Sequence, residues 1–347
     1  MATAPTTQAA GLIDRLVFPV GVALALIHLW ANSVGNISDL RLNALHFAGF
    51  AFLCLLTRPL LRRPAGWLRA VDLGLGLLVI GCTAYLMAME DAIYARGLRL
   101  TPLEMASAWV LIAAAVETTR RATGWVVPVL IVLALSYVAW WGALIEGVFS
   151  FRGLSLETLL FRSIFGDDAL FGNIARISAT FVFMFILFGA FLIRSGAGEF
   201  IIDLAQGVAG RWAGGPGLVA VLASGLTGTI SGAAVANTVS TGVITIPLMK
   251  RAGFPPRFAG GIEAAASTGG QLVPPIMGAG AFVMASYTQI PYSTIVAVSA
   301  LPALLYFFAV GSFVRLEARR LGLRGSSEQG RPLGETLRRG GPAFHDR

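Results

Sequence analysis

The chain has 347 residues, of which 56% are hydrophobic and only 13% are charged, and its mean hydropathy is +0.75. Soluble domains carry about 25% charged residues, so this chain lacks the polar groups needed to cover a globular surface. The same numbers exclude a disordered chain, a collagen and a coiled coil. Because the apolar stretches are continuous rather than alternating, they also argue against a transmembrane β-barrel. The composition predicts an all-α polytopic membrane protein.

Six apolar runs before residue 194 predict membrane-spanning helices. The fourth run is short unless its helix begins near Pro102. Two semi-polar stretches, 146–175 and 197–213, predict helices and loops that lie at the membrane interface. In chain order, the spans are expected at residues 16–32, 42–57, 71–89, 105–117, 124–145 and 177–193.

Residues 216–250 predict a re-entrant hairpin. The apolar run 217–230 would measure about 21 Å as a helix, too short for a hydrocarbon core of roughly 30 Å. It breaks at Ser231-Gly232, and a second apolar run continues to Lys250. Two short arms joined by a polar tip are tolerated at that depth only where they are buried in protein or line a cavity.

Residues 257–287 predict a discontinuous helix. A glycine pair ending at Gly270 loosens the helix, and Pro274 and Pro275 remove two backbone donors. We expect free carbonyl groups here, near the middle of the bilayer. The remaining elements expected are helix again over residues 276–287, a last span at about 293–314 and a polar tail, 321–347.

The net charge of +8 comes from basic residues between the apolar segments, which indicates topology rather than a nucleic-acid partner. With a cytoplasmic N-terminus and a hairpin that enters and leaves on one side, sixteen Lys and Arg residues up to Arg324 face the cytoplasm and six face outside. This bias predicts that the N- and C-termini are both cytoplasmic. Cys54 and Cys82 lie alone in apolar runs, so neither a disulfide nor a metal site is expected.

Hard neutral oxygens accumulate at the two breaks. Unwound carbonyl groups and hydroxyls suit an alkali cation, and helix N-termini at the same breaks can face a carboxylate. Hairpins and broken helices that meet at mid-depth are typical of secondary transporters. The alternative is that glycines and small hydroxyl residues only allow close helix packing. The hydroxyls belong to Ser231, Thr238, Ser240, Thr241, Ser267 and Thr268.

The sequence gives little support for an enzymatic function, because it has no GxSxG, HExxH, P-loop or GxGxxG motif. His28 and His46 lie on apolar runs away from acidic clusters, which favours hydrogen-bonded core histidines. Asp72 and Glu117 lie near span ends, which favours solvated or capping roles. Glu263 differs, because an ionisable residue inside a broken membrane helix is a functional candidate. Its alternative is an ion pair with a nearby arginine.

Two long stretches resemble the large permease subunit of TRAP transporters. Residues 228–285 begin GTISGAAVANTVSTG and end STGGQLVPPIMGAGAFVMA, and residues 181–215 read FVFMFILFGAFLIRSGAGEFIIDLAQGVAGRWAGG. Downstream, PALLYFF and VRLEARRLGL fit the same family. The chain is similar to fused permeases that work with TAXI-type periplasmic binding proteins, strongly from about 124 to 324 and on weaker motifs over 1–123.

The resemblance implies an elevator-type, sodium-coupled importer of organic anions in the bacterial inner membrane. Its substrate would arrive on a periplasmic binding protein, and no cofactor is expected beyond the coupling ion, Na⁺. In the family, one sodium site combines the first hairpin tip with carbonyls of a GGxxPP break, although Ala233 replaces a hydroxyl residue expected at the tip. Residue by residue, this implies sodium ligands at Ser231, Gly270, Val273 and Pro275, and we expect a lining of Asn237, Thr241, Glu263, Ser267, Thr268 and Gln271.

The resemblance also implies three regions: a small-subunit-like four-helix region (1–123), the first half of a large permease (124–320) and a polar tail or linker (321–347). Fused permeases continue with an inverted second half. We therefore expect a truncated copy, or one product of a split gene whose second half comes from a separate chain. The alternatives are a non-transporting membrane scaffold or degenerate fragment, and an intramembrane enzyme, for which the spans supply no nucleophile–base pair.

Overall fold

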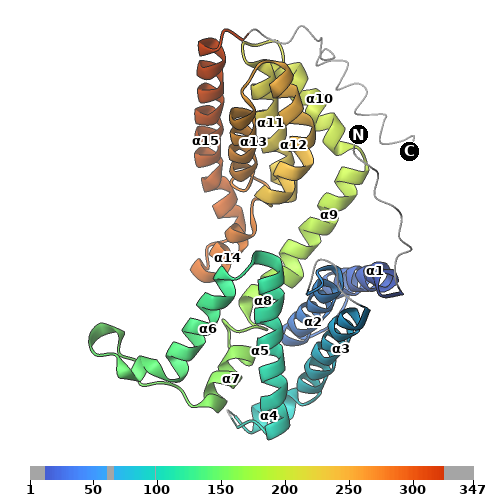
Figure 1. Ribbon diagram of the computed structural model, residues 1–347, viewed down its shortest axis with the longest axis vertical. Coiled ribbons are helices and arrows are strands. Elements are labelled where there is room, and N and C mark those ends of the chain that lie inside the picture. The colour runs from blue at the N-terminus through green and yellow to red at the C-terminus, as the bar shows by residue number, and fades with distance from the viewer. Residues whose placement is uncertain (1–11, 61–65, 98, 324–347) are drawn as a thin grey trace. The chain divides into compact units, whose positions relative to one another are not determined.

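The computed structural model describes residues 12–60, 66–97 and 99–323, and every regular element within these ranges is a helix (Figure 1). The expectations for the first eleven residues and for the tail beyond residue 323 lie outside the described residues. The chain packs as two compact units, Met1–Thr180 and Phe181–Arg347. The predicted boundary at 123/124 rests on the resemblance rather than on packing, and it stays a prediction.

Among the described residues, five helices are long and apolar enough to cross a membrane, which confirms the all-α polytopic membrane protein. Four of the six runs predicted before residue 194 and the last predicted span fall within them, apart from one residue at the end of two of the runs. These helices cover Arg15–Ser33, Asp39–Thr57, Trp67–Ala88, Asn173–Leu192 and Tyr292–Arg320.

In its described residues, unit 1 contains helices α1 to α8. Of the two remaining predicted spans, α5 does begin at Pro102, where Thr101 and Glu104 form a capping box. The stretch 146–175 contains short helices, and its place at the membrane interface stays a prediction. The bounds are α1 (Leu12–Ser33), α2 (Asp39–Thr57), α3 (Gly66–Ala88), α4 (Glu90–Ala95), α5 (Pro102–Thr123), α6 (Val126–Ala139), η1 (Trp141–Leu144), η2 (Gly147–Phe149), α7 (Leu156–Phe165) and α8 (Asn173–Ile177), followed by the π-helical turn η3 (Ser178–Val182).

The span predicted over 124–145 is wrong in length. Helix α6 has 14 residues and ends at Ala139, because Trp140 leaves the helical region at φ −135° and ψ −60°. The main chain then folds back, and the Leu154 N–H donates to the Val138 carbonyl over 3.0 Å. A 14-residue helix measures about 21 Å, short of a bilayer core of roughly 30 Å. The run stays apolar to Ile145, but apolarity alone does not distinguish helix from turn.

A buried ion pair joins α3 to α5 in unit 1. The Arg121 guanidinium lies 2.8 Å from the Asp72 carboxylate, and both side chains are less than 5% exposed. Arg121 also donates to Glu117 over 2.7 Å and to the Arg58 carbonyl over 3.0 Å, which ties in the end of α2. The solvated or capping role predicted for Asp72 is therefore wrong, because its partner lies on a different helix and only packing brings them together.

The two histidines of unit 1 are hydrogen-bonded core residues, as predicted. His28 is fully buried, and its Nδ1 lies 2.7 Å from the Leu24 carbonyl. Its Nε2 lies 2.9 Å from His46 Nδ1, and His46 Nε2 lies 2.9 Å from the Ser178 hydroxyl. The rings thus join α1 and α2 to the start of η3.

Unit 2 is built around α11 (Gly215–Ser231), which contacts five other helices. The amphipathic stretch predicted over 197–213 forms α10, whose buried face includes Ile201, Ala205 and Ala209. The remaining helices are α9 (Phe183–Arg194), α10 (Ala197–Ala209), α12 (Ala234–Arg251), α13 (Pro256–Gly270), α14 (Ala279–Thr288) and α15 (Tyr292–Arg320) (Figure 1).

One end of unit 2 gathers the start of α11 and the ends of α12 and α15. A Cβ added to Gly214 would lie 2.5 Å from Ala318 Cβ, and one added to Gly253 would lie 2.8 Å from Leu323 Cδ2. The basic residues in the last turns of α12 and α15 therefore share this end. This is the arrangement that the basic-residue bias requires of a cytoplasmic face.

Cysteine accessibility tests this topology. In a background with Cys54 and Cys82 replaced by alanine, we expect a membrane-impermeant maleimide to label Gln289→Cys on intact cells and to miss Lys250→Cys. The reason is that α11 and α12 return to the same end, whereas Gln289 follows α14 after a single further passage through unit 2. Arg211→Cys is the matched control and should behave like Lys250→Cys. Labelling of Lys250→Cys from outside the cell would refute the hairpin assignment.

Candidate functional site

The two predicted breaks meet in unit 2. Helix α11 ends at Ser231, and the left-handed φ of +60° at the next residue, Gly232, turns the chain towards α12. The two helices form an antiparallel hairpin, since Ser224 on α11 contacts Asn237 and, one turn later, Thr241 on α12. A Cβ at Gly232 would lie 2.6 Å from the Met277 carbonyl oxygen, so the hairpin tip packs directly on the segment that follows α13.

Two glycines let α11 and α13 touch backbone to backbone. A Cβ on Gly228 would lie 2.5 Å from Gly270 Cα, and a Cβ on Gly270 would lie 2.7 Å from Gly228 Cα. Real Cβ atoms do not approach a backbone so closely, and only glycine fits at either position. The contact fixes the last turn of α13 beside the last turn of α11.

The break after α13 is longer than predicted, because regular helix resumes only at Ala279 in α14. Its carbonyls are also not free as expected. The Gly270 carbonyl accepts from the Val273 N–H over 3.2 Å, and the Pro275 carbonyl accepts from the Tyr292 hydroxyl over 2.9 Å. A carbonyl oxygen has two lone pairs, so each can still accept a second donor or bind a cation.

The predicted sodium ligand Ser231 has a buried hydroxyl oxygen with no hydrogen-bond partner among the described residues. The same holds for the Thr227 hydroxyl, one turn earlier on α11, and for the amide oxygen of Asn237 near the start of α12. Buried polar atoms are usually paired, so three unpaired oxygens near one hairpin tip call for a ligand or water.

Four of the expected lining residues come together one to two turns below the tip. Asn237, Thr241, Glu263 and Ser267 are all buried, and Asn237 and Glu263 are fully so. The Asn237 amide donates to the Ser224 carbonyl over 2.7 Å and reaches the hydroxyls of Ser224 and Ser267 at 3.0 and 3.3 Å.

The other expected residues do not join this group. Thr268 is exposed, and its hydroxyl donates to the Ala264 carbonyl of its own helix over 2.8 Å. Gln271 is exposed at the break, beside Gly278. Val273 and Pro275 lie in the break itself, half-buried and exposed respectively.

Glu263 is held by hydroxyls from three helices. One carboxylate oxygen accepts from Ser224 on α11 over 3.0 Å, from Ser267 over 3.1 Å and from Thr241 on α12. The second oxygen lies 2.5 Å from the Thr245 hydroxyl. The arginine partner considered for Glu263 is not found among the described residues.

Ser224 and Thr245 were not among the predicted site residues. A signal for them exists in the sequence, because Asn237, Thr241 and Thr245 recur every four residues and lie on one face of α12. Ser224 and Gly228 share the same spacing on α11. Small polar residues that repeat at i, i+4 within apolar helices thus indicate a buried polar seam, which here consists of Ser224 on α11 and Asn237, Thr241 and Thr245 on α12.

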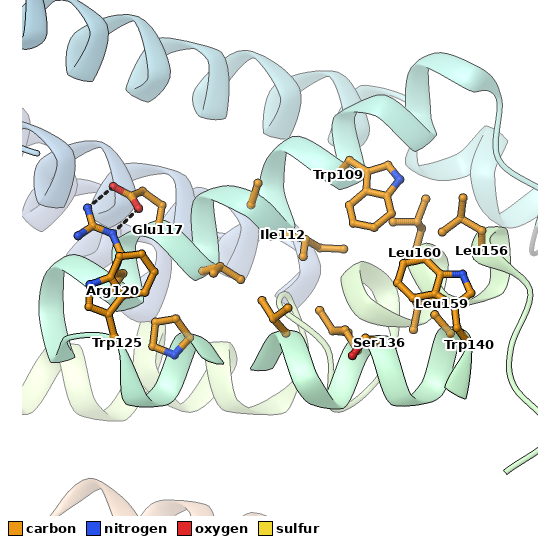
Figure 2. A pocket seen from close by; sticks show the side chains of 16 residues that line it. Trp109, Ile112, Glu117, Arg120, Trp125, Ser136, Trp140, Leu156, Leu159 and Leu160 are labelled. Carbon is orange, nitrogen blue, oxygen red and sulfur yellow. Dashed lines mark hydrogen bonds and ion pairs between the residues drawn. The ribbon is translucent and has the colours of Figure 1, made fainter. Parts of the chain in front are cut away.

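Unit 1 offers a pocket of different chemistry, an apolar cavity of about 410 Å³ between α5, α6 and α7 (Figure 2). Trp109, Trp125 and Trp140 line its wall, and Arg120 lies over the Trp125 ring, 5.1 Å from its centre. The charged groups beside Trp125 already pair with each other, since Arg120 donates twice to Glu117 over 2.7 and 2.8 Å. Because this cavity lacks uncommitted hard oxygens, we place the candidate ion site in unit 2.

Comparison with known proteins places the chain in a transporter class. Residues 110–344 match the model of the family described as "Tripartite ATP-independent periplasmic transporter, DctM component". The chain belongs to this family of TRAP transporter large permeases, a family of transporters rather than enzymes.

Three relatives illustrate the match. The C4-dicarboxylate TRAP transporter large permease protein DctM of Rhodobacter capsulatus is 35% identical over 106 residues, 30% of this chain and 24% of the relative. Its counterpart in Pseudomonas aeruginosa is 40% identical over 91 residues, 26% and 21% of the two chains. The sialic acid TRAP transporter large permease protein SiaM of Vibrio cholerae is 30% identical over 182 residues, 50% and 42%. The aligned segment thus covers less than half of each relative's length.

Proposed function

We propose that the chain is a membrane permease component of a sodium-coupled, binding-protein-dependent secondary transporter that imports organic anions such as carboxylates. The family supports the transporter class, and the relatives are named for C4-dicarboxylate and sialic acid, both organic acids. The observation that carries the proposal is the contact between the hairpin tip and the break after α13, where unpaired buried oxygens collect.

The sodium ion would bind where the tip meets the break. The Ser231 hydroxyl would supply one oxygen, and the carbonyls of Gly270, Val273 and Pro275 would supply the others. Hydroxyl and carbonyl oxygens are hard, neutral ligands that suit an alkali cation. Asn237 has an unpaired amide oxygen beside this position, whereas Thr268 and Gln271 are exposed and would contact substrate or water.

We infer the partners from the family and from the resemblance to permeases that work with TAXI-type binding proteins. A periplasmic binding protein of the TAXI type would deliver the substrate, and the part of the relatives' length that this chain does not span would come from a further segment or a separate chain. The protein would lie in the bacterial inner membrane, with both termini cytoplasmic.

A serine substitution tests the ion site. With the complete transporter and its binding protein in proteoliposomes, we expect Ser231→Ala to raise the sodium concentration for half-maximal uptake by about tenfold, since one neutral ligand is lost and the carbonyls remain. Ser240→Ala is the matched control on the other arm, because Ser240 is exposed and its hydroxyl already donates to the Asn237 carbonyl. Equal sodium dependence in Ser231→Ala and wild type would remove Ser231 from the site. Uptake without any sodium dependence, or none at all, would favour a proton-driven permease or a non-transporting scaffold.

A further inference from the structure

Glu263 is a fully buried carboxyl group surrounded by neutral donors. Its exposed fraction is 0%, and each of its hydrogen-bonding neighbours is a serine or threonine hydroxyl: Ser224, Thr241, Thr245 and Ser267. Transfer of an uncompensated carboxylate out of water is among the most unfavourable events in folding, and hydroxyl dipoles offset only part of it. A buried site of this kind requires a positive charge.

The elements packed around Glu263 do not bring that charge among the described residues. Helix α11 has no titratable side chain. Tyr306 on α15 is near, but its hydroxyl donates to the Ala265 carbonyl over 2.9 Å. The Tyr292 hydroxyl, at the start of α15, donates to the Pro275 carbonyl. None of the other titratable residues on these helices pairs with Glu263 in the described part of the chain: Lys250 and Arg251 in the last turn of α12, Arg257 in the first turn of α13, and Arg315, Glu317, Arg319 and Arg320 at the end of α15.

The hydroxyl hydrogens of Thr241 and Thr245 also indicate that a cation binds to Glu263. The Thr245 hydroxyl has a single hydrogen and lies both 3.0 Å from the Thr241 carbonyl and 2.5 Å from a Glu263 oxygen. If the hydroxyl donates to the carbonyl, as threonines in helices often do, two oxygens face each other without a hydrogen between them. Thr241 has the same choice, because its hydroxyl lies 2.8 Å from the Asn237 carbonyl. A proton on one carboxyl oxygen supplies the missing hydrogen at one of these positions, and an alkali ion would bind the lone pairs of the oxygens at either.

We propose that Glu263, with the hydroxyls of Ser224, Thr241, Thr245 and Ser267, forms a binding site for one monovalent cation, a proton or an alkali ion taken from the aqueous phase. This site is separate from the sodium site proposed at the hairpin tip, and it binds its ion with a formal charge rather than with neutral oxygens. It spans α11, α12 and α13, so occupancy by the cation holds both arms of the hairpin against α13.

Infrared spectroscopy of the purified full chain tests the site without a transport assay. The carbonyl stretch of a protonated carboxylic acid separates from that of a carboxylate, and the wild-type minus Glu263→Gln difference isolates Glu263. We expect a carboxylic-acid band in sodium-free buffer. If the site exchanges its proton for an alkali ion, sodium chloride will remove the band, whereas choline chloride will not. If the site binds only a proton, sodium chloride will not change the band, and the band will disappear as the pH rises. Either result supports the site.

Two variants keep the test decisive. Glu199→Gln changes an exposed carboxylate on α10 and should leave the difference band intact. Thr245→Val preserves the side-chain shape but removes one hydroxyl, and it should shift the sodium concentration or proton activity at half effect by about tenfold. The proposal is overturned if wild type shows no carboxylic-acid band and no sodium response at any pH at which it stays folded, or if Thr245→Val titrates like wild type.

Discussion

Replacing Gly270 with valine is expected to reduce sodium-dependent uptake to background. A Cβ at this position would lie 2.7 Å from Gly228 Cα, and the obstacle is backbone rather than a side chain that can move. The hairpin tip must therefore separate from α13, and the β-branched side chain also restricts the last turn of the helix, where the Gly270 carbonyl is expected to bind the ion.

Gly261→Val is the matched control for this experiment. Gly261 lies on the same helix and is exposed, and a Cβ added there would meet no heavy atom within 4 Å. The control variant carries the same change in helix propensity, so we expect its uptake to stay within about twofold of wild type. Both variants are measured in the same proteoliposomes under a sodium gradient. Wild-type transport by Gly270→Val would show that the close contact serves packing alone and that the proposed ion site is misplaced.

Replacing Arg121 with methionine is expected to destabilise unit 1 by about 3–5 kcal/mol, the usual effect of leaving one partner of a buried ion pair uncompensated. Asp72 would lose its cationic partner on α5 in a site that is 2% exposed, and the end of α2 would lose its hydrogen bond from the guanidinium. Thermal unfolding of the purified protein in detergent, together with its yield from membranes, measures the loss.

Two further variants separate charge from packing. Asp72→Asn added to Arg121→Met removes the stranded charge and should restore much of the lost stability, as a double-mutant cycle would register. Arg41→Gln breaks the pair between Arg41 and Glu90, in which the arginine is half exposed, and should cost at most about 1 kcal/mol. If Arg121→Met and Arg41→Gln unfold at the same temperature, the buried ion pair contributes no more to stability than the exposed one.

The breaks in unit 2 could be predicted from the sequence because their causes are local. Gly232 adopts a left-handed conformation that other residues avoid, and Pro274 and Pro275 cannot donate to a helix wherever they stand. The end of α6 was missed because apolar residues continue beyond Ala139 while the backbone leaves the helix at Trp140. Hydropathy reports the surroundings of a segment and not its dihedral angles.

The partners of the buried polar groups could not be predicted, since they come from packing between helices distant in sequence. Glu263 stood out as ionisable, but its contact with Ser224 depends on the register of α11 against α13, which the Gly228–Gly270 contact fixes in space. In the same way, Asp72 and Arg121 each lie near a helix end and look solvated until α3 and α5 pack together.

The enclosure of α11 has a consequence for biosynthesis. Twelve of its seventeen residues are buried, and two of the helices that cover it, α13 and α15, are synthesised later. A nascent chain that has exposed α11 but not yet α15 has no completed protein surface to receive this short helix, and lipid cannot satisfy its polar seam. We therefore expect the hairpin to reach its final packing only after α13 and α15 have left the ribosome. Ribosome stalling before that point would leave α11 without two of the helices that cover it.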